Sequence, residues 1–337
     1  MANLRVGVLG AGRIGKIHIE NLARRIQGVE LVAVADALPE ELEALKAKYG
    51  IADAYSDWRN VVEHPGVDAV VICLPTDAHY SAIMAAAAAG KHIFCEKPVD
   101  LCLAKIDEIS AEVRKAGIQT MVGFNRRFDP TFLKVRDMVA SGKVGKPHVV
   151  KITSRDPAPP PENYLRASGG IFMDMTIHDF DMARYLSGSE VVEVYARATV
   201  LVDPVFEKVG DWDTAIVSLT FENGALGTID NSRKAVYGYD QRIEVFGSEG
   251  MVTVKNNTPD NHVFLDRVGT HASLPLNFFM ERYTESYLNE MQAFVDSLRK
   301  GQTVPVNEAD GRMAVAIALA AAKSATEHRP VKMSEIR

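Results

Sequence analysis

A lysine between an acidic residue and a proline is the first candidate for chemistry in this sequence. Glu96-Lys97-Pro98 directly follows the apolar run His92–Cys95, which predicts a strand. A lysine at the end of a strand can donate a hydrogen bond to a substrate hydroxyl as a compact positive charge and so favour loss of the hydroxyl proton. A surface lysine leaving a strand would look the same, so Lys97 alone does not decide the matter. The Lys97–Pro98 peptide is also a candidate for the cis form.

The second candidate is a charged stripe on an apolar helix, which we expect to span residues 171–186. Asp174, His178 and Asp181 have the spacing i, i+4, i+7 and would share one helical face. In that arrangement His178 can take a proton from a hydroxyl while Asp174 stabilises the imidazolium that forms. Taken singly, Asp174 fits an ordinary carboxylate near a helix N-terminus, and His178 fits a buried, hydrogen-bonded histidine. The same pair could bind a metal, but no third ligand is evident, and we expect none.

A glycine-rich turn near the start of the chain predicts where a cofactor binds. Gly10, Gly12 and Gly15 follow an apolar strand with the spacing G-x-G-x-x-G, which permits a tight turn, a close pyrophosphate and a closely packed helix. About 20 residues further on, a second apolar run ends at Asp36, where a carboxylate can accept hydrogen bonds from ribose hydroxyls. That carboxylate would repel a 2′-phosphate, and the next two residues are uncharged. The pattern therefore favours NAD over NADP.

The elements that would position these residues fall into two domains. Residues 1–124 alternate between strands and helices, which predicts a Rossmann-type, doubly wound parallel sheet. Its polar strand ends would meet at one edge of the sheet, where ligands bind in such folds. Residues 125–337 contain a proline-rich loop, a run of β-rich segments and two closing helices. They predict an α+β domain with an open, mostly antiparallel sheet, whose last helix can pack back on the first domain.

Composition limits the classes of protein to consider. The chain has 337 residues, 47% of them hydrophobic and 24% charged, with a formal net charge of −6. These values are typical of a soluble globular protein and give no reason to expect nucleic acid or an anionic membrane as partner. We find no apolar run of the roughly 18 residues that a spanning helix needs. The three cysteines lack metal-site spacing, and no signal peptide is apparent, so we expect a cytoplasmic protein.

Three separated motifs, in this order, resemble the glucose–fructose oxidoreductase / inositol dehydrogenase (Gfo/Idh/MocA) family over essentially the whole chain. They are the segment 10–15, the Glu96-Lys97-Pro98 turn, and Gly169-Gly170 followed by Asp174 and His178. Segments 123–129, 153–160 and 174–181 further resemble its myo-inositol 2-dehydrogenase branch.

The resemblance implies a role for each matching residue. Lys97 would bind the reacting hydroxyl near the nicotinamide, and His178 would be the general base with Asp174 as its partner. The implied substrate-binding residues are Lys97, Arg127, Asp156, Asp174, Thr176, His178, Asp181 and Tyr237. The implied cofactor-binding residues are Gly10, Gly12, Arg13, Ile14, Asp36, Leu74, Pro75, Thr76, His79, Glu96 and Lys97.

The activity that the resemblance implies is the NAD-dependent oxidation of myo-inositol to scyllo-inosose. An alternative within the family is a dehydrogenase of another cyclic polyol or sugar, such as scyllo-inositol, an aldose or an anhydrosugar. A third reading is a non-catalytic NAD-binding regulator, which would not need Lys97, Asp174 and His178 together. The family's second domain often forms oligomers, so a homotetramer with a small-molecule substrate is expected.

Overall fold

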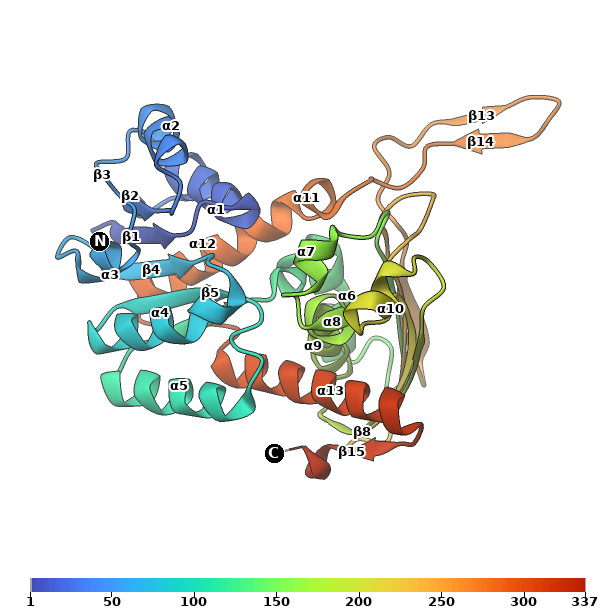
Figure 1. Cartoon of the computed structure of the whole chain (residues 1–337). Coiled ribbons are helices and arrows are strands. Elements are labelled where there is room, and N and C mark those ends of the chain that lie inside the picture. Colours follow the sequence, from blue (N-terminus) through green and yellow to red (C-terminus); the bar gives the residue numbers. More distant parts are fainter. Residues whose placement is uncertain (1, 337) are drawn as a thin grey trace. The chain divides into compact units, whose positions relative to one another are not determined.

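The computed structural model describes residues 2–336, which form two compact units (Figure 1). Unit 1 contains the residues up to Phe128 together with Glu285–Val315, and unit 2 contains Asp129–Thr284 and the residues from Ala316 onward. The chain therefore returns to unit 1 after completing most of unit 2. Among the described residues, no helix is long and apolar enough to cross a membrane.

Unit 1 is built around a six-stranded parallel sheet with the order β3-β2-β1-β4-β5-β6. Its strands are β1 (Leu4–Leu9), β2 (Val29–Ala35), β3 (Asp53–Tyr55), β4 (Ala69–Ile72), β5 (His92–Glu96) and β6 (Thr120–Gly123). Its helices are α1 (Arg13–Arg24), α2 (Pro39–Tyr49), α3 (Arg59–Glu63), α4 (Thr76–Ala88), α5 (Leu103–Ala116), the 3₁₀ turn η1 (Asn125–Phe128), α12 (Thr284–Lys300) and the first part of α13 (Glu308–Glu327).

Helices cover both faces of this sheet. Val6 and Val8 of β1 are fully buried in a core shared with α1, α2 and α12. Because side chains alternate along a strand, Gly7 faces the opposite side, where a Cβ would lie 2.3 Å from Val61 of α3. Burial on both faces explains why β4 is apolar throughout, as central parallel strands are. The predicted doubly wound sheet is confirmed.

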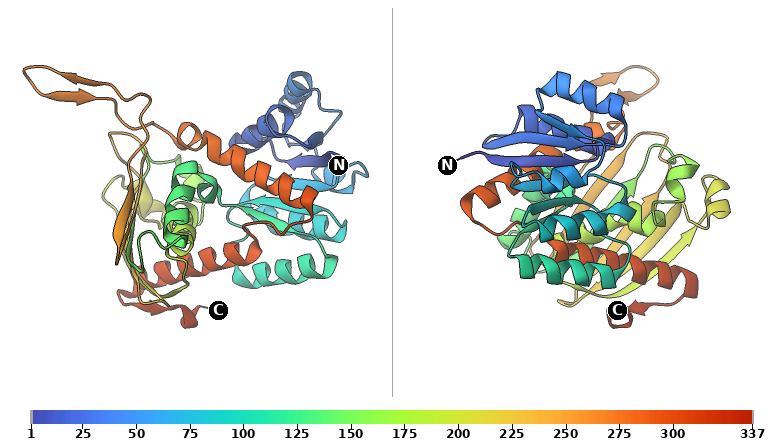
Figure 2. Two further views of the ribbon diagram at one scale, coloured as in Figure 1. Left: turned by 180° about the vertical axis from the view of Figure 1, so that it is seen from behind. Right: turned by 60° about the vertical axis from the view of Figure 1, so that its left-hand side comes forward.

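Unit 2 contains a seven-stranded sheet with the order β12-β11-β7-β10-β9-β8-β15. Only β7 and β10 pair in parallel, so the predicted mostly antiparallel sheet is also confirmed. The strands are β7 (Pro147–Arg155), β8 (Val191–Thr199), β9 (Thr214–Phe221), β10 (Leu226–Ser232), β11 (Asp240–Gly247), β12 (Gly250–Val254) and β15 (Val331–Lys332). A separate hairpin, β13 (Val263–Leu265) with β14 (Thr270–Ala272), extends from this unit (Figures 1 and 2).

Helices lie on one face of the unit 2 sheet (Figure 2). They are α6 (Pro130–Ala140), α7 (Glu162–Leu165), α8 (Gly170–Asp174) and α9 (Thr176–Ser187), with the short α10 (Val205–Val209), α11 (Phe279–Arg282) and η2 (Met333–Glu335) at the periphery. Strands β8 to β11 alternate between buried and exposed side chains along most of their length. This alternation places one face of the sheet in the core and leaves the other exposed.

Candidate active site

The glycine turn has the geometry that a dinucleotide needs. Gly10 has φ +94°, and a Cβ there would lie 2.7 Å from the carbonyl oxygen of Cys73. A Cβ on Gly15 would lie 2.0 Å from the carbonyl oxygen of Gly10, so α1 can pack on β1 only without a side chain. A Cβ on Gly12 would meet no atom within 4 Å. The turn is therefore crowded on its protein side and open at Gly12, where the N-terminus of α1 presents backbone N–H groups suited to phosphate.

Asp36 links the end of β2 to this turn. Its Oδ2 accepts a hydrogen bond from the backbone N–H of Ala11 at 2.6 Å, and its Oδ1 accepts one from Leu38 at 2.9 Å. Each carboxylate oxygen has a second lone pair, so these bonds leave capacity for ribose hydroxyls. Leu38 is uncharged and its side chain is 61% exposed, so it brings no cation to the carboxylate.

A buried histidine joins the turns after β4 and β5. The imidazole of His79 lies 2.8 Å from the Pro98 carbonyl oxygen through Nδ1 and 2.9 Å from the Leu74 carbonyl oxygen through Nε2. The Lys97–Pro98 peptide between these elements is cis. Because both ring nitrogens contact carbonyl groups of the chain, any effect of His79 on the cofactor would act through the backbone of these two turns.

Another predicted site residue of unit 1 is Arg127, in η1. Its Nη2 donates to Oδ1 of Asp310, on α13, at 3.0 Å. This ion pair is largely buried and anchors η1, the turn that follows β6. The contact of Arg127 with the substrate stays a prediction.

The predicted helix over residues 171–186 is wrong in one respect, because the structure has two helices there. Helix α8 ends at Asp174 and α9 begins at Thr176. The break falls at Met175, and the Thr176 hydroxyl that follows it bonds to Asn231, on β10. Asp174 and His178 are both partly buried, and Asp181 is buried. The three residues therefore come from two short helices and not from one continuous face.

A buried arginine that the sequence did not single out organises the carboxylates of unit 2. Arg233 Nη1 lies 3.2 Å from Asp156 Oδ2, and its Nη2 lies 2.9 Å from Asp174 Oδ2. Tyr164, on α7, donates its hydroxyl to Asp174 Oδ1 at 2.7 Å. Burial disfavours the charged guanidinium, but the two carboxylates outweigh it and raise the pKa of Arg233 above its usual range. Burial and the neighbouring Asp174 also raise the pKa of Tyr164.

A second buried network fixes α9 on the sheet. Asp179 is fully buried, and its oxygens accept hydrogen bonds from the Ser154 hydroxyl at 2.6 Å and from Asn231 Nδ2 at 2.8 Å. The hydroxyl of Thr176 donates to Asn231 Oδ1 at 2.7 Å. The residues before and after His178 are therefore tied to β7 and β10, which sets the orientation of the helix that carries it.

Tyr237 and Thr176 were predicted to contact substrate, and both have partners within unit 2. The Tyr237 hydroxyl donates to Asp240 Oδ2 at 2.6 Å and accepts from Arg155 Nη1 at 3.0 Å. Thr176 is fully buried beside Asn231. Their roles as substrate contacts stay predictions. The structure brings Asp156 and Asp174 together through Arg233, whose only signal in the sequence is a cation directly after a β-rich segment.

Accessible backbone N–H groups at the N-terminus of α1, beside a carboxylate placed for a ribose, define the class of dinucleotide-binding proteins. Residues 4–124 match the family described as an oxidoreductase family with an NAD-binding Rossmann fold, and residues 132–253 match the GFO/IDH/MocA C-terminal domain. The chain belongs to the GFO/IDH/MocA family. The resemblance stated from the motifs is thereby confirmed, as is NAD as the cofactor class.

Relatives of the chain match it over nearly its whole length. A Thermotoga maritima protein named myo-inositol 2-dehydrogenase is 51% identical over 99% of both chains. The crystal structure of a Corynebacterium glutamicum myo-inositol dehydrogenase has a TM-score of 0.94 and 38% identity, covering 98% of each chain. The crystal structure of a Lactobacillus casei scyllo-inositol dehydrogenase with bound NAD(H) and scyllo-inositol has a TM-score of 0.91 and 30% identity, covering 98% of this chain and 99% of that one.

Proposed function

We propose that this protein oxidises myo-inositol to the ketone scyllo-inosose with NAD as the hydride acceptor. The observation that carries the proposal is the pair of carboxylates, Asp156 and Asp174, that the buried Arg233 holds in unit 2. Fixed acceptors of this kind suit a ring that carries a hydroxyl on every carbon, because such a site rejects analogues that lack the hydroxyls. The 51% identity to a protein named myo-inositol 2-dehydrogenase supports the same substrate.

In this reaction His178 removes the proton of the reacting hydroxyl through its imidazole. Asp174, held by Arg233 and Tyr164, stabilises the imidazolium that results. The Lys97 ammonium donates a hydrogen bond to the same hydroxyl oxygen and offsets the negative charge that develops there. NAD, when bound, supplies the hydride acceptor. The carbon thus loses a hydride, its oxygen loses a proton to His178, and a carbonyl group forms.

A second candidate substrate is scyllo-inositol, which differs from myo-inositol in the configuration of one hydroxyl. The Lactobacillus casei relative with bound scyllo-inositol favours it, although that protein is only 30% identical to this chain. The two substrates present the same hydroxyls to most of the site. The acceptors that surround the reacting position, Asp156 and Asp181 among them, would decide between them.

Initial rates with myo-inositol, scyllo-inositol and glucose, each with NAD and with NADP, test the proposal. We expect the highest kcat/KM with myo-inositol and NAD, and at least about tenfold less with NADP because Asp36 repels a 2′-phosphate. Lys97→Ala and His178→Ala should each lower kcat by about 100-fold or more. A His178→Ala enzyme with unchanged kcat and a raised KM would contradict the role of His178 as base. No turnover of any polyol would overturn the function itself.

We also propose a homotetramer that works in the cytoplasm. The exposed face of the unit 2 sheet carries large apolar side chains, and so does the β13–β14 hairpin, which favours contact with further copies of the chain. The cysteines Cys73, Cys95 and Cys102 are free thiols, which suits a reducing compartment.

A further inference from the structure

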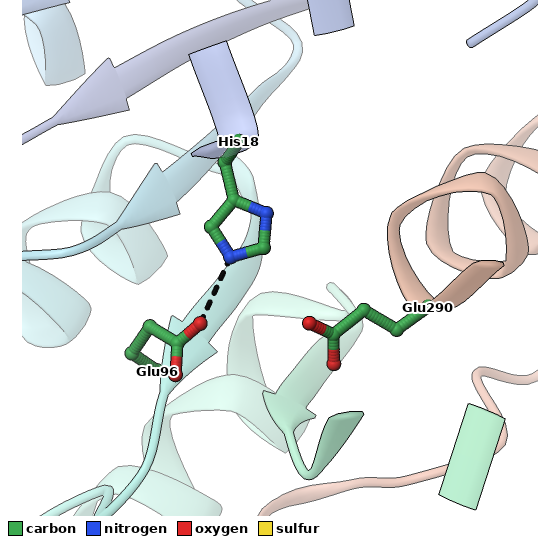
Figure 3. A group of neighbouring side chains, drawn as sticks. All are labelled: His18, Glu96 and Glu290. Atoms are coloured by element: carbon green, nitrogen blue, oxygen red, sulfur yellow. Dashed lines mark hydrogen bonds and ion pairs between the residues drawn. The ribbon is translucent and has the colours of Figure 1, made fainter. Parts of the chain in front are cut away.

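Unit 1 contains a buried group of three titratable side chains directly behind the Glu96-Lys97-Pro98 turn. Figure 3 shows His18 from α1, Glu96 from the end of β5 and Glu290 from α12, with the Glu290 carboxyl group directed toward the other two. His18 Nε2 lies 2.8 Å from Glu96 Oε1. One ligand-type atom from each residue lies within 4.8 Å of the other two.

This group lies in an apolar environment. His18 and Glu290 are fully buried, and the Glu96 side chain is 13% exposed. The His18 ring packs edge-on against Phe94 at 5.1 Å and Tyr287 at 5.9 Å between ring centroids. Carboxylates in such surroundings keep a negative charge only if a cation or several hydrogen bonds compensate it.

The group contains two carboxyl groups but only one side chain, His18, that can compensate a negative charge. Within residues 2–336, neither carboxyl oxygen of Glu290 has a hydrogen-bond partner, and neither does His18 Nδ1. Glu96 and His18 face Glu290, and the Cys73 thiol, after the end of β4, lies within range of its charge. The Tyr287 ring packs on His18, and the Cys95 thiol interacts with Glu96. One imidazole can compensate at most one of the two carboxylates, and it already contacts Glu96. Burial, followed by the charge of Glu96, raises the pKa of Glu290 well above its ordinary value of 4.5.

We propose that Glu290 is a neutral carboxylic acid in the working enzyme, and that His18 and this neutral Glu290 act together as positioning residues for Lys97. A neutral Glu290 lets Glu96 remain a carboxylate against His18, and Glu96 in turn fixes the start of the turn that carries Lys97. A charged Glu290 would repel Glu96 within the core. The effect on Lys97 rests on the proposed function, whereas the charge state of Glu290 does not.

The first test measures the charge state through thermal stability. Below pH 4.5 the unfolded chain also holds the Glu290 proton; above that pH the unfolded chain releases the proton while the fold retains it. Stability due to Glu290 is therefore fully present at acid pH and is lost as pH rises toward the folded-state pKa. Glu290→Gln has no carboxyl group to titrate, so its stability does not fall in this way as the pH rises. Its Tm should therefore rise relative to that of the wild type between pH 5 and pH 9, by about 3 °C or more. A constant difference, or a variant that becomes relatively less stable at alkaline pH, would overturn the neutral state.

The second test measures positioning with a matched pair of variants. His18→Gln keeps an N–H near the place of Nε2, whereas His18→Phe keeps the packing on Phe94 and Tyr287 but cannot donate. We expect kcat to fall by about tenfold or more in His18→Phe and to stay within about threefold in His18→Gln, with NADH affinity unchanged in both. Equal kcat in the two variants would contradict the positioning role. If His18→Phe fails to fold, His18→Gln alone tests the positioning role. A fall in its kcat by more than tenfold would contradict that role.

Two further outcomes separate this proposal from its alternatives. Elemental analysis of the purified wild-type protein should find no stoichiometric divalent metal; one bound ion per chain that Glu290→Gln loses would overturn the neutral acid in favour of a metal site. If the wild-type protein turns over no polyol, the proposed function fails, but the dependence of Tm on pH still decides the charge state of Glu290.

Discussion

At the scale of single residues, Arg233 shows how one buried cation can hold two carboxylates of the candidate site together. It holds Asp156 and Asp174, which come from a loop and from the end of α8, and it lies directly after β10. Without this cation, two carboxylates would lie close together in a partly buried space. Mutual repulsion would then favour protonation of one of them. A protonated Asp174 could not stabilise an imidazolium through its charge.

Replacing this arginine should therefore impair catalysis more than folding. We expect Arg233→Ala to lower kcat/KM for the polyol by about 100-fold or more, because Asp174 would lose the cation that keeps its carboxylate charged and in place. Arg233→Lys should recover only part of the loss, since an ammonium cannot bind two carboxylates as a planar fork does. The decisive measurement is rescue of Arg233→Ala by added guanidinium, compared with sodium at the same ionic strength. Wild-type rates in Arg233→Ala would show that catalysis does not need the pairing of Arg233 with Asp156 and Asp174.

At the scale of elements, the sequence predicted most helices and strands because their signals are local. Apolar periodicity and glycine or proline at the ends are properties of neighbouring residues: α2 begins at Pro39 and is followed by Gly50, and α5 is followed by Gly117. The break at Met175 was not predictable in this way, because it depends on a Thr176 hydroxyl whose partner Asn231 lies in a distant strand. For the same reason the sequence suggested Asp174 and His178 but neither Arg233 nor Asp179, whose partners are separated from them by many residues.

The packing of α1 on β1 gives a prediction that separates folding from cofactor binding. In Gly15→Ala the new Cβ would lie 2.0 Å from a backbone oxygen, so the helix must move, and we expect Tm to fall by about 5 °C or more and NADH binding to be lost. Gly12→Ala is the matched control, since its Cβ meets no protein atom within 4 Å. It should leave Tm within about 1 °C and weaken NADH binding by about tenfold or more, by obstructing the phosphates. Calorimetry and NADH fluorescence titration measure the two effects; unchanged NADH affinity in Gly12→Ala would place the cofactor elsewhere.

At the scale of the whole molecule, unit 1 is formed by two segments that are separated in the sequence by most of unit 2. The segment Glu285–Val315 belongs to unit 1 although it follows most of unit 2. It supplies Glu290 to the group behind the Lys97 turn and Asp310 to Arg127. The sequence predicted two closing helices there and assigned both to the domain 125–337, with the last one able to pack back on the first domain. The pattern of an amphipathic helix does not identify the surface that the helix covers. Segments that precede and follow most of unit 2 in the sequence therefore form unit 1 together.

The exposed face of the unit 2 sheet leads to a prediction about assembly. Tyr195, Ile216 and Phe246 lie on strands β8, β9 and β11 with exposed side chains, in a sheet whose other face is covered by helices. If copies of the chain associate through this face, a charge at its centre would be buried without a partner, at a cost of several kcal/mol per interface. We expect the wild type to sediment at four times the chain mass of 36.9 kDa, and Ile216→Glu/Phe246→Glu to dissociate to smaller species at the same concentration. Leu201→Glu is the control, because Leu201 is an even more exposed apolar residue that lies outside the strands, and this change should leave the mass unchanged. A monomeric wild type, or a double variant that remains tetrameric, would contradict assembly through this face.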